Sequence, residues 1–118
     1  MKPEIGNCYI NDKKNIRNFG KSKIKKLLGF EFNKETFVYI CNCIVQYMND
    51  CVYDSIDFES KNWKENTSKY LKEDALDFYN DELNDYVELD EKQAREFIHN
   101  FPNIVKNLIK NDIIIFEN

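Results

Sequence analysis

The chain has 118 residues, of which 32% are charged and 14% aromatic, and its formal net charge is −4. This length fits one domain with a modest core, and the composition is that of an ordinary globular protein, which excludes a disordered chain. No stretch approaches the length of a membrane span and the N-terminus lacks the apolar core of a signal peptide, so we expect an intracellular protein.

The charges are unevenly distributed along the chain. Residues 1–35 carry nine Lys/Arg against four Asp/Glu, whereas residues 36–118 carry eight against seventeen. A basic first part favours an anionic partner, and an acidic remainder favours a basic one. Four cysteines without a secretion signal or CxxC spacing indicate buried free thiols rather than disulfides or zinc ligands.

The first predicted elements are an irregular arm and a short basic helix. Residues 1–19 show no sustained hydrophobic period, so we expect a weakly basic arm. Gly20 and Gly29 bracket a helix of two to three turns with one apolar edge. Its remaining surface carries lysines, which repel one another by about 0.2–0.5 kcal/mol per pair at helical spacing. An anionic ligand explains such a cluster better than a solvated face does.

The stretch from Glu35 to Phe58 predicts one long helix that is apolar on more than one side. Of residues 36–58, 15 of 23 are apolar or aromatic. One stripe has three-and-four spacing, but Val38 and Val45 lie off it. At about 1.5 Å per residue the helix is a rod of roughly 36 Å. Either a second subunit completes its cover, or the rod is the centre of a compact all-helical bundle.

After the long helix, residues 61–70 predict a polar connector with a short extended piece near Thr67–Tyr70. A third helix follows over residues 70–84, and its buried edge comprises Leu71, Ala75 and Phe78. The helix dipole stabilises the acidic residues in its first turn.

The C-terminal part predicts a fourth helix and an apolar tail. Asp90 and Gln93 have the spacing of a capping box before residues 91–100, and Asn100 and Pro102 would end that helix. The apolar run 113–116 is unlikely to face water, so we expect it to dock on its own domain or on a partner.

The short–long–short order of helices resembles the histone fold, and four segments resemble core histone 2A in the same order. They are FGKSKIKKLL (19–28), Tyr47–Met48 with Asp54 in the long helix, NDELN (80–84) and FPNIVKNLIK (101–110). The resemblance implies an all-α protein with an irregular N-terminal arm over residues 1–19 and a histone fold over residues 20–84. A C-terminal helix and docking extension would occupy residues 85–118.

The resemblance implies a non-catalytic DNA-packaging protein of chromatin. It would pair as a heterodimer with a histone 2B-like chain and join histone 3/4-like chains in a nucleosome-like particle. It would bind double-stranded DNA through the phosphate backbone, without sequence specificity and without a cofactor or metal. The implied location is the nucleus of the host cell, or a virion or viral factory.

The resemblance also implies three sets of site residues. The DNA-binding set comprises Lys21, Lys23, Lys25, Lys26, Lys34, Thr67, Ser68 and Lys69. The acidic patch, which would receive basic peptides, comprises Asp50, Asp54, Asp81 and Glu82. The docking segment comprises Pro102, Asn103 and Ile104.

Three features depart from the family's pattern. The chain has only two arginines, Arg17 and Arg95, and so lacks arginine-rich tails. The first loop is shorter, and residues 85–100 form an insert. These departures indicate a divergent histone of a large DNA virus or a fast-evolving eukaryote, or a histone-fold protein with another use.

Two alternatives remain open beside the histone interpretation. One is a histone-fold transcription factor subunit, and the other is an acidic helical interaction module that does not bind DNA. No Ser-His-Asp or Cys-His arrangement, Gly-rich phosphate loop or metal-ligand set can be assembled, so we expect no enzymatic activity. The histone interpretation requires a second polypeptide across the long helix.

Overall fold

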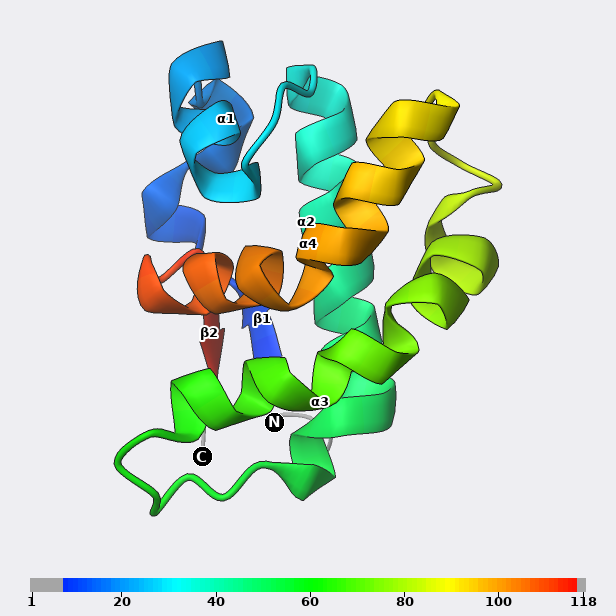
Figure 1. The fold of residues 1–118 in the computed structure, drawn as a ribbon. Helices are drawn as coiled ribbons and strands as arrows, with labels where there is room; N and C mark the ends of the chain where they lie inside the picture. The colour runs from blue at the N-terminus through cyan, green and yellow to red at the C-terminus, as the bar shows by residue number, and fades with distance from the viewer. Residues whose placement is uncertain (1–7, 117–118) are drawn as a thin grey trace.

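The computed structural model describes residues 8–116, apart from the side chains of residues 54, 65 and 68–70. Most of the described chain is helical, as expected for an all-α protein. Figure 1 shows α2 running through the molecule with α1, α3 and α4 around it. The elements in chain order, where η marks a short 3₁₀ or π-helical segment, are β1 (Cys8–Ile10), η1 (Asp12–Lys14), η2 (Ile16–Asn18), α1 (Lys21–Leu28), α2 (Lys34–Tyr47), η3 (Met48–Val52), η4 (Tyr53–Ser55), α3 (Trp63–Phe78), η5 (Tyr79–Leu83), α4 (Glu91–Lys110) and β2 (Ile114–Phe116).

Helix α1 has the bounds that its glycines predict. Gly20 is its N-cap, and Gly29 ends it with a φ of 90°, a left-handed conformation that glycine adopts without a steric penalty. The Gly29 N–H donates to the Lys25 carbonyl at 2.7 Å. Ile24, Leu27 and Leu28 are buried, which confirms the predicted apolar edge.

The predicted long helix is helical from Lys34 to Ser55, but only its first 14 residues are α-helical. Asn33 caps it, since its side chain accepts a hydrogen bond from the Thr36 N–H at 2.7 Å. The π turn η3 and the 3₁₀ turn η4 complete the element, which ends three residues before the predicted Phe58.

The chain covers this long element by itself. Segments β1, η2, η5 and α1 contact α2, and the Phe101 ring of α4 lies 6.2 Å from the Tyr47 ring. Five side chains of α2 and η3 have an exposed fraction of 0%, namely Phe37, Ile40, Cys41, Ile44 and Met48. Of the two expected arrangements, the structure therefore has the compact bundle rather than a rod that a second subunit must cover.

Helix α3 begins at Trp63, so the prediction of a polar connector with an extended piece near Thr67–Tyr70 is wrong. Thr67 lies one turn inside the helix, where its hydroxyl donates to the Trp63 carbonyl at 2.7 Å. This bond satisfies the hydroxyl in a site where only 1% of the residue is exposed. Thr67 thereby joins Leu71 and Ala75 in one buried stripe at helical spacing.

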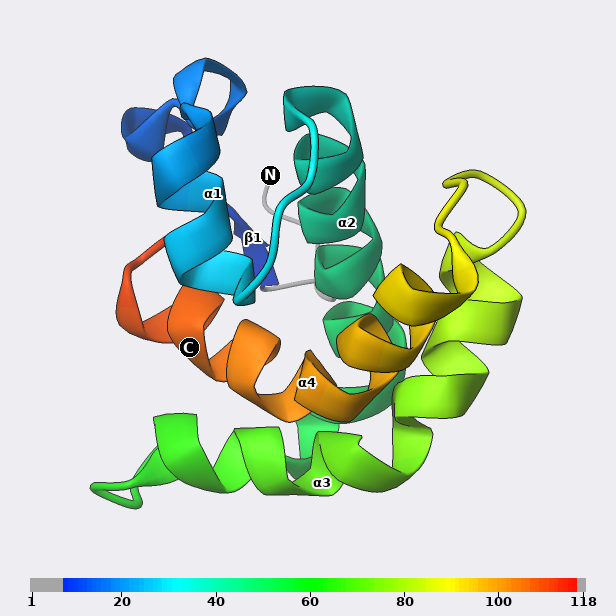
Figure 2. The same cartoon turned by 45° about the horizontal axis from the view of Figure 1, so that its top comes forward.

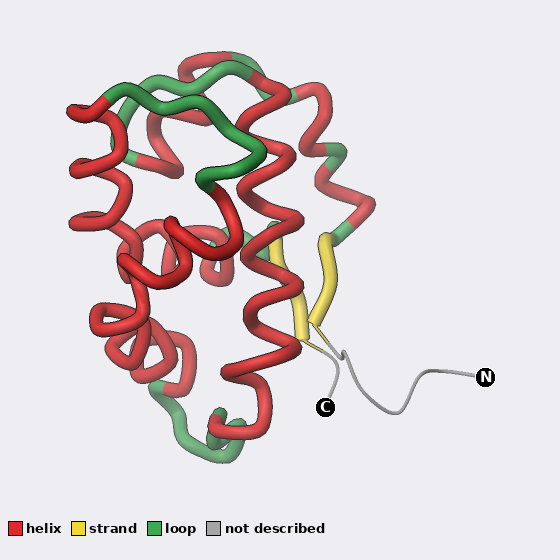
Figure 3. The backbone as a smooth tube through the Cα atoms, turned by 90° about the vertical axis from the view of Figure 1, so that its right-hand side faces the viewer, coloured by secondary structure: helices red, strands yellow, loops and turns green. Residues whose placement is uncertain are grey.

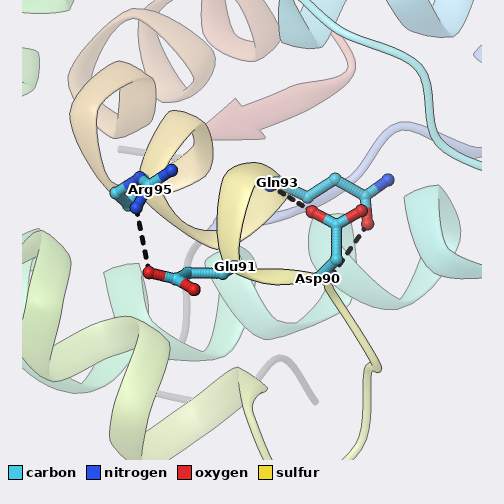
Figure 4. Close-up of polar contacts among 4 residues, drawn as sticks. All are labelled: Asp90, Glu91, Gln93 and Arg95. Carbon is cyan, nitrogen blue, oxygen red and sulfur yellow. Dashed lines mark hydrogen bonds and ion pairs between the residues drawn. The ribbon is translucent and has the colours of Figure 1, made fainter.

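Helix α4 starts with the predicted capping box. The Asp90 carboxylate accepts from the Gln93 N–H at 2.7 Å, and the Asp90 N–H donates to the Gln93 side chain at 3.1 Å. Figure 4 shows this pair beside the ion pair of Arg95 with Glu91, which spans 3.0 Å on the exposed face.

The predicted end of this helix at Asn100 and Pro102 is wrong, because α4 continues to Lys110. Pro102 lacks the N–H that would bond the Ile98 carbonyl, and proline inside a helix bends it. Figure 1 shows that α4 changes direction along its length. Six apolar residues on both sides of the proline are at most 1% exposed, and their burial offsets its cost. They are Phe97, Phe101, Ile104, Val105, Leu108 and Ile109.

The described parts of the two chain ends pair as antiparallel strands, with Tyr9 opposite Ile115 (Figure 3). The apolar run 113–116 therefore docks on its own domain, as one of the two expected outcomes. The predicted irregular arm is wrong for residues 8–18, which form β1, η1 and η2. Residues 1–7 of that arm lie outside the described residues.

Candidate nucleic-acid interface

The solvent side of α1 carries four exposed lysines and no carboxylate. Lys21, Lys23, Lys25 and Lys26 occupy it, and we refer to them as the basic face. Because Ile24, Leu27 and Leu28 take the buried edge of this short helix, the lysines are left on the outside. The adjoining η1 and η2 add three exposed basic side chains, Lys13, Lys14 and Arg17, against one acidic residue, Asp12.

Lys23 is held over an aromatic ring. Its Nζ lies 4.2 Å from the centroid of Phe19, which is buried and stacks on Phe37 at 5.7 Å. A cation–π contact of this kind contributes about 0.5–1 kcal/mol at an exposed site. It keeps the Lys23 ammonium close to the body of the protein while the charge stays accessible to a ligand.

The structure separates the predicted DNA-binding residues of α3 from the basic face. Lys34 is exposed at the first residue of α2 and follows Asn33, which lines a depression together with Lys21. Helix α3 begins at the far end of the molecule (Figures 1 and 2). Thr67 is buried within α3, so its predicted role in DNA binding is wrong. Ser68 and Lys69 follow it in the same helix, and their side chains lie outside the described part of the structure.

Two members of the predicted acidic patch line a shallow groove of about 240 Å³ between the end of α2 and the end of α3. We refer to this depression as the acidic groove. Asp81 and Glu82 belong to it, Asp50 is exposed on η3 without lining it, and the side chain of Asp54 is not described. Its lining residues are Tyr47, Cys51, Asp74, Asp77, Phe78, Asp81 and Glu82.

Asp74 and Asp77 are functional candidates that the sequence reasoning missed. With Asp81 they recur at intervals of three and four residues, a spacing that places all three on one side of a helix and could have revealed them. The Tyr47 hydroxyl donates to the Asp74 carboxylate. Burial, and then this hydrogen bond, raise the pKa of Tyr47 above its ordinary value.

The acidic groove also raises the pKa of the Cys51 thiol. All four cysteines are free, and the predicted burial is confirmed for Cys8, Cys41 and Cys43 but wrong for Cys51. Burial against the groove wall raises the pKa of Cys51, and the negative charges of Asp50, Glu82 and Asp74 raise it further. The thiol is therefore disfavoured as a thiolate although it is exposed.

The predicted docking segment lies inside α4 rather than in a separate tail. Ile104 is 1% exposed and belongs to the protein's own core, so the prediction that it docks on another chain does not fit this arrangement. Pro102 is partly buried at the bend, and only Asn103 is exposed.

Most of the acidic residues of the chain's second half lie away from α1. Residues 73–91 carry nine Asp/Glu and no Lys/Arg. Glu88 of this run is an exception, because it lines a depression together with Lys21 and Glu31. Figure 2 shows α1 on one side and η5 with the following loop on the other, with α2 and α4 between them. An anionic polymer can therefore approach α1 without meeting the carboxylates of α3 and η5 at close range.

Neither a metal site nor a membrane span is present among the described residues. No group of three or more His, Cys, Asp or Glu in this part of the chain could hold a metal ion. No helix within residues 8–116 combines the length and apolarity needed to cross a membrane.

Comparison with known proteins returned no match: no family model, no curated protein and no solved structure is similar to this chain at a significant level.

Proposed function

We propose that this protein is a non-catalytic DNA-packaging protein that binds the phosphate backbone of double-stranded DNA through the basic face of α1. The observation that carries the proposal is the set of four exposed lysines on an eight-residue helix without a carboxylate. The three basic residues of η1 and η2 add positive charge in the segment that precedes this helix. The position of the α3 and η5 carboxylates on the other side of the molecule supports the same assignment (Figure 2).

The binding energy comes from neutralising phosphates. Each lysine that meets a phosphate releases condensed counterions, so the affinity falls as the salt concentration rises. Four phosphate contacts correspond to a slope of roughly −3.6 in log K against log [salt]. Lysine lacks the planar fork of arginine and is more strongly hydrated, which favours reversible contacts to the backbone over base readout.

The resemblance to histone 2A extends this proposal to a subunit of a nucleosome-like particle. The order of a short basic helix, a long apolar helix and a third helix supports the extension. In that role the chain pairs with a histone 2B-like chain and then joins histone 3/4-like chains on DNA. The particle would belong to chromatin in the nucleus, or to a virion or viral factory.

The covered long helix places a condition on this pairing. A partner helix can lie along α2 only where the chain's own segments withdraw, and Phe101 of α4 now packs beside Tyr47. Pairing by a histone handshake therefore requires α4 to leave part of the core. A monomer that binds DNA without opening would match the DNA-binding proposal and contradict the histone 2A-like one.

A salt titration tests the DNA-binding proposal. The purified protein is mixed with a fluorescent DNA duplex, and its anisotropy is measured over a series of salt concentrations. A steep negative slope is expected, and a slope near zero would contradict DNA binding. Micrococcal nuclease digestion with all four histone-like chains then tests for a protected, wrapped length of DNA. Protection of a defined length supports the nucleosome-like particle, and its absence contradicts it.

The acidic groove favours a second candidate function, the docking of a basic peptide. Its carboxylates surround a floor formed by the largely buried rings of Tyr47 and Phe78, so a lysine or arginine side chain would find charge and some apolar contact. Binding of a lysine-rich peptide should weaken in the double variant D77N/D81N and not in D12N/D57N, which removes the same charge outside the groove. Equal binding by both variants would contradict this function.

A further inference from the structure

A second depression lies between α1 and the C-terminal end of α4, with a volume of about 430 Å³. We refer to it as the α1–α4 groove. Its two walls are far apart in the sequence and side by side in the fold (Figure 2). The lining residues are Ser22, Lys23, Lys26 and Leu27 from α1, and Asn107 and Asn111 from the end of α4.

The chemistry of this lining selects an anion that also carries hydroxyl or ether oxygens. Two ammonium groups, one hydroxyl and two amides line the groove, and none of its lining residues is an acid. Leu27, which is 5% exposed, contributes apolar surface beneath them. Only half of the basic face, Lys23 and Lys26, belongs to this lining. Lys23 is also the lysine that the Phe19 ring holds in place.

Two helix ends meet at the groove, and their carbonyl groups would ordinarily repel an anion. The side-chain amide of Asn107 donates to the Leu27 carbonyl at 3.1 Å, in the last turn of α1. The amide of Asn111 donates to the Asn107 carbonyl at 2.7 Å, in the last turn of α4. Each amide has a second N–H for a ligand. The two asparagine side chains thus form hydrogen bonds with carbonyl groups at the helix ends, and their remaining N–H groups can donate to an anion in the groove.

We propose that the α1–α4 groove seats the sugar-phosphate backbone of one DNA strand. Lys23 and Lys26 bind phosphate oxygens, while Ser22 and the amides of Asn107 and Asn111 bind phosphate or deoxyribose oxygens. This inference rests on the proposed DNA binding and deepens it, because it distinguishes the two lysines that hold the strand in the groove from the two whose phosphate contacts lie outside it. It also adds the end of α4, which sequence reasoning assigned to protein docking.

Two matched pairs of variants test the groove, with the anisotropy of a fluorescent DNA duplex as the measurement. K23Q/K26Q removes two charges inside the groove, and K21Q/K25Q removes two from the same helix outside it. N111D introduces a carboxylate into the groove, and N103D introduces one at an exposed position of the same helix. Circular dichroism and thermal melting establish that each variant is folded.

The groove variants should bind DNA about tenfold more weakly than their matched controls at roughly 0.1 M salt, because K23Q/K26Q loses two positioned phosphate contacts and N111D places a negative charge next to the strand. Equal losses of DNA affinity within each pair would contradict the proposal that the groove seats the DNA strand, while DNA binding by the basic face would still hold. Failure of the unaltered protein to bind DNA at any salt concentration would overturn the proposed function itself. The two failures are therefore distinguishable.

Discussion

The side-chain amide of Asn49 pairs with both backbone polar groups of Cys8. The Cys8 N–H donates to the Asn49 Oδ1 at 2.9 Å, and the Asn49 Nδ2 donates to the Cys8 carbonyl at 2.8 Å. Asn49 lies in η3, so a side chain of the long helical element completes the hydrogen bonding of β1 where a neighbouring strand would do so. The contact ties the first described residue of the chain to its centre.

Replacing Asn49 by alanine should destabilise the fold. Loss of two partly buried hydrogen bonds costs about 1–3 kcal/mol in the free energy of unfolding. Urea denaturation measures this difference. The control is Asn42→Ala, since Asn42 is exposed and its side-chain amide donates to the Val38 carbonyl of its own helix at 3.1 Å. A loss no larger than that of the control would show that Asn49 does not hold β1.

Replacing three lysines of the basic face should weaken DNA binding and flatten its dependence on salt. K23Q/K25Q/K26Q removes three potential phosphate contacts, so the slope of log K against log [salt] should become shallower by roughly 2.7. The residues are exposed, and the thermal midpoint should change little. Salt-dependent anisotropy is the measurement, and an unchanged slope would place the DNA on another surface.

Phe101 should be essential for the stability of the single chain. Its ring lies 4.7 Å from that of Phe78 and 5.7 Å from that of Phe97, and the residue is 0% exposed. Truncation to alanine leaves a cavity and should cost about 3–5 kcal/mol in unfolding free energy. Asn103→Ala, an exposed change on the same helix, should cost far less.

The Phe101 variant also tests how α4 relates to the rest of the protein. In a closed bundle, the loss of Phe101 lowers the midpoint of one cooperative unfolding transition. If α4 were loosely attached and the long helix open to a partner, Phe101→Ala would differ little from Asn103→Ala. That result would contradict the closed bundle and favour the handshake.

Alkylation should be confined to Cys51 and should be slow at neutral pH. Burial raises the pKa of Cys8 and Cys41 to about 12 and also raises that of Cys43, whereas Cys51 is exposed. The reactive species is the thiolate, and the raised pKa of Cys51 lowers its fraction at any pH below that value. Its rate with iodoacetamide should therefore keep rising with pH beyond the ordinary thiol range.

Asp50→Asn should accelerate this alkylation, because removing a neighbouring negative charge lowers the Cys51 pKa. The measurement is the rate of mass increase at fixed pH. Asp12→Asn, an exposed change on η1, serves as the control with the same loss of charge. If both variants react at the rate of the unaltered protein, the neighbouring carboxylates do not set the reactivity of Cys51.

Capping residues and glycines in the sequence correctly predicted where some helices begin or end. Gly20 and Gly29 bound α1, and Asp90 with Gln93 starts α4, because caps and left-handed glycines act within a few residues. The predicted helix end at Pro102 was wrong for a tertiary reason: apolar side chains buried on both sides of the proline offset its local cost. The start of α3 was missed similarly, since Thr67 is helical in a buried site that satisfies its hydroxyl.

The sequence by itself determined the separation of a lysine-rich first part from an acidic remainder, because charge follows directly from residue type. It also determined that the long apolar segment must be covered on several sides. Only the tertiary structure decided what covers it. Segments β1, η2 and η5 do so together with α1 and α4, and long-range packing of this kind leaves no trace in local spacing. The same packing brings Asn107 and Asn111 to the lysines of α1, some eighty residues earlier in the chain. The resulting groove therefore could not be predicted from any sequence motif.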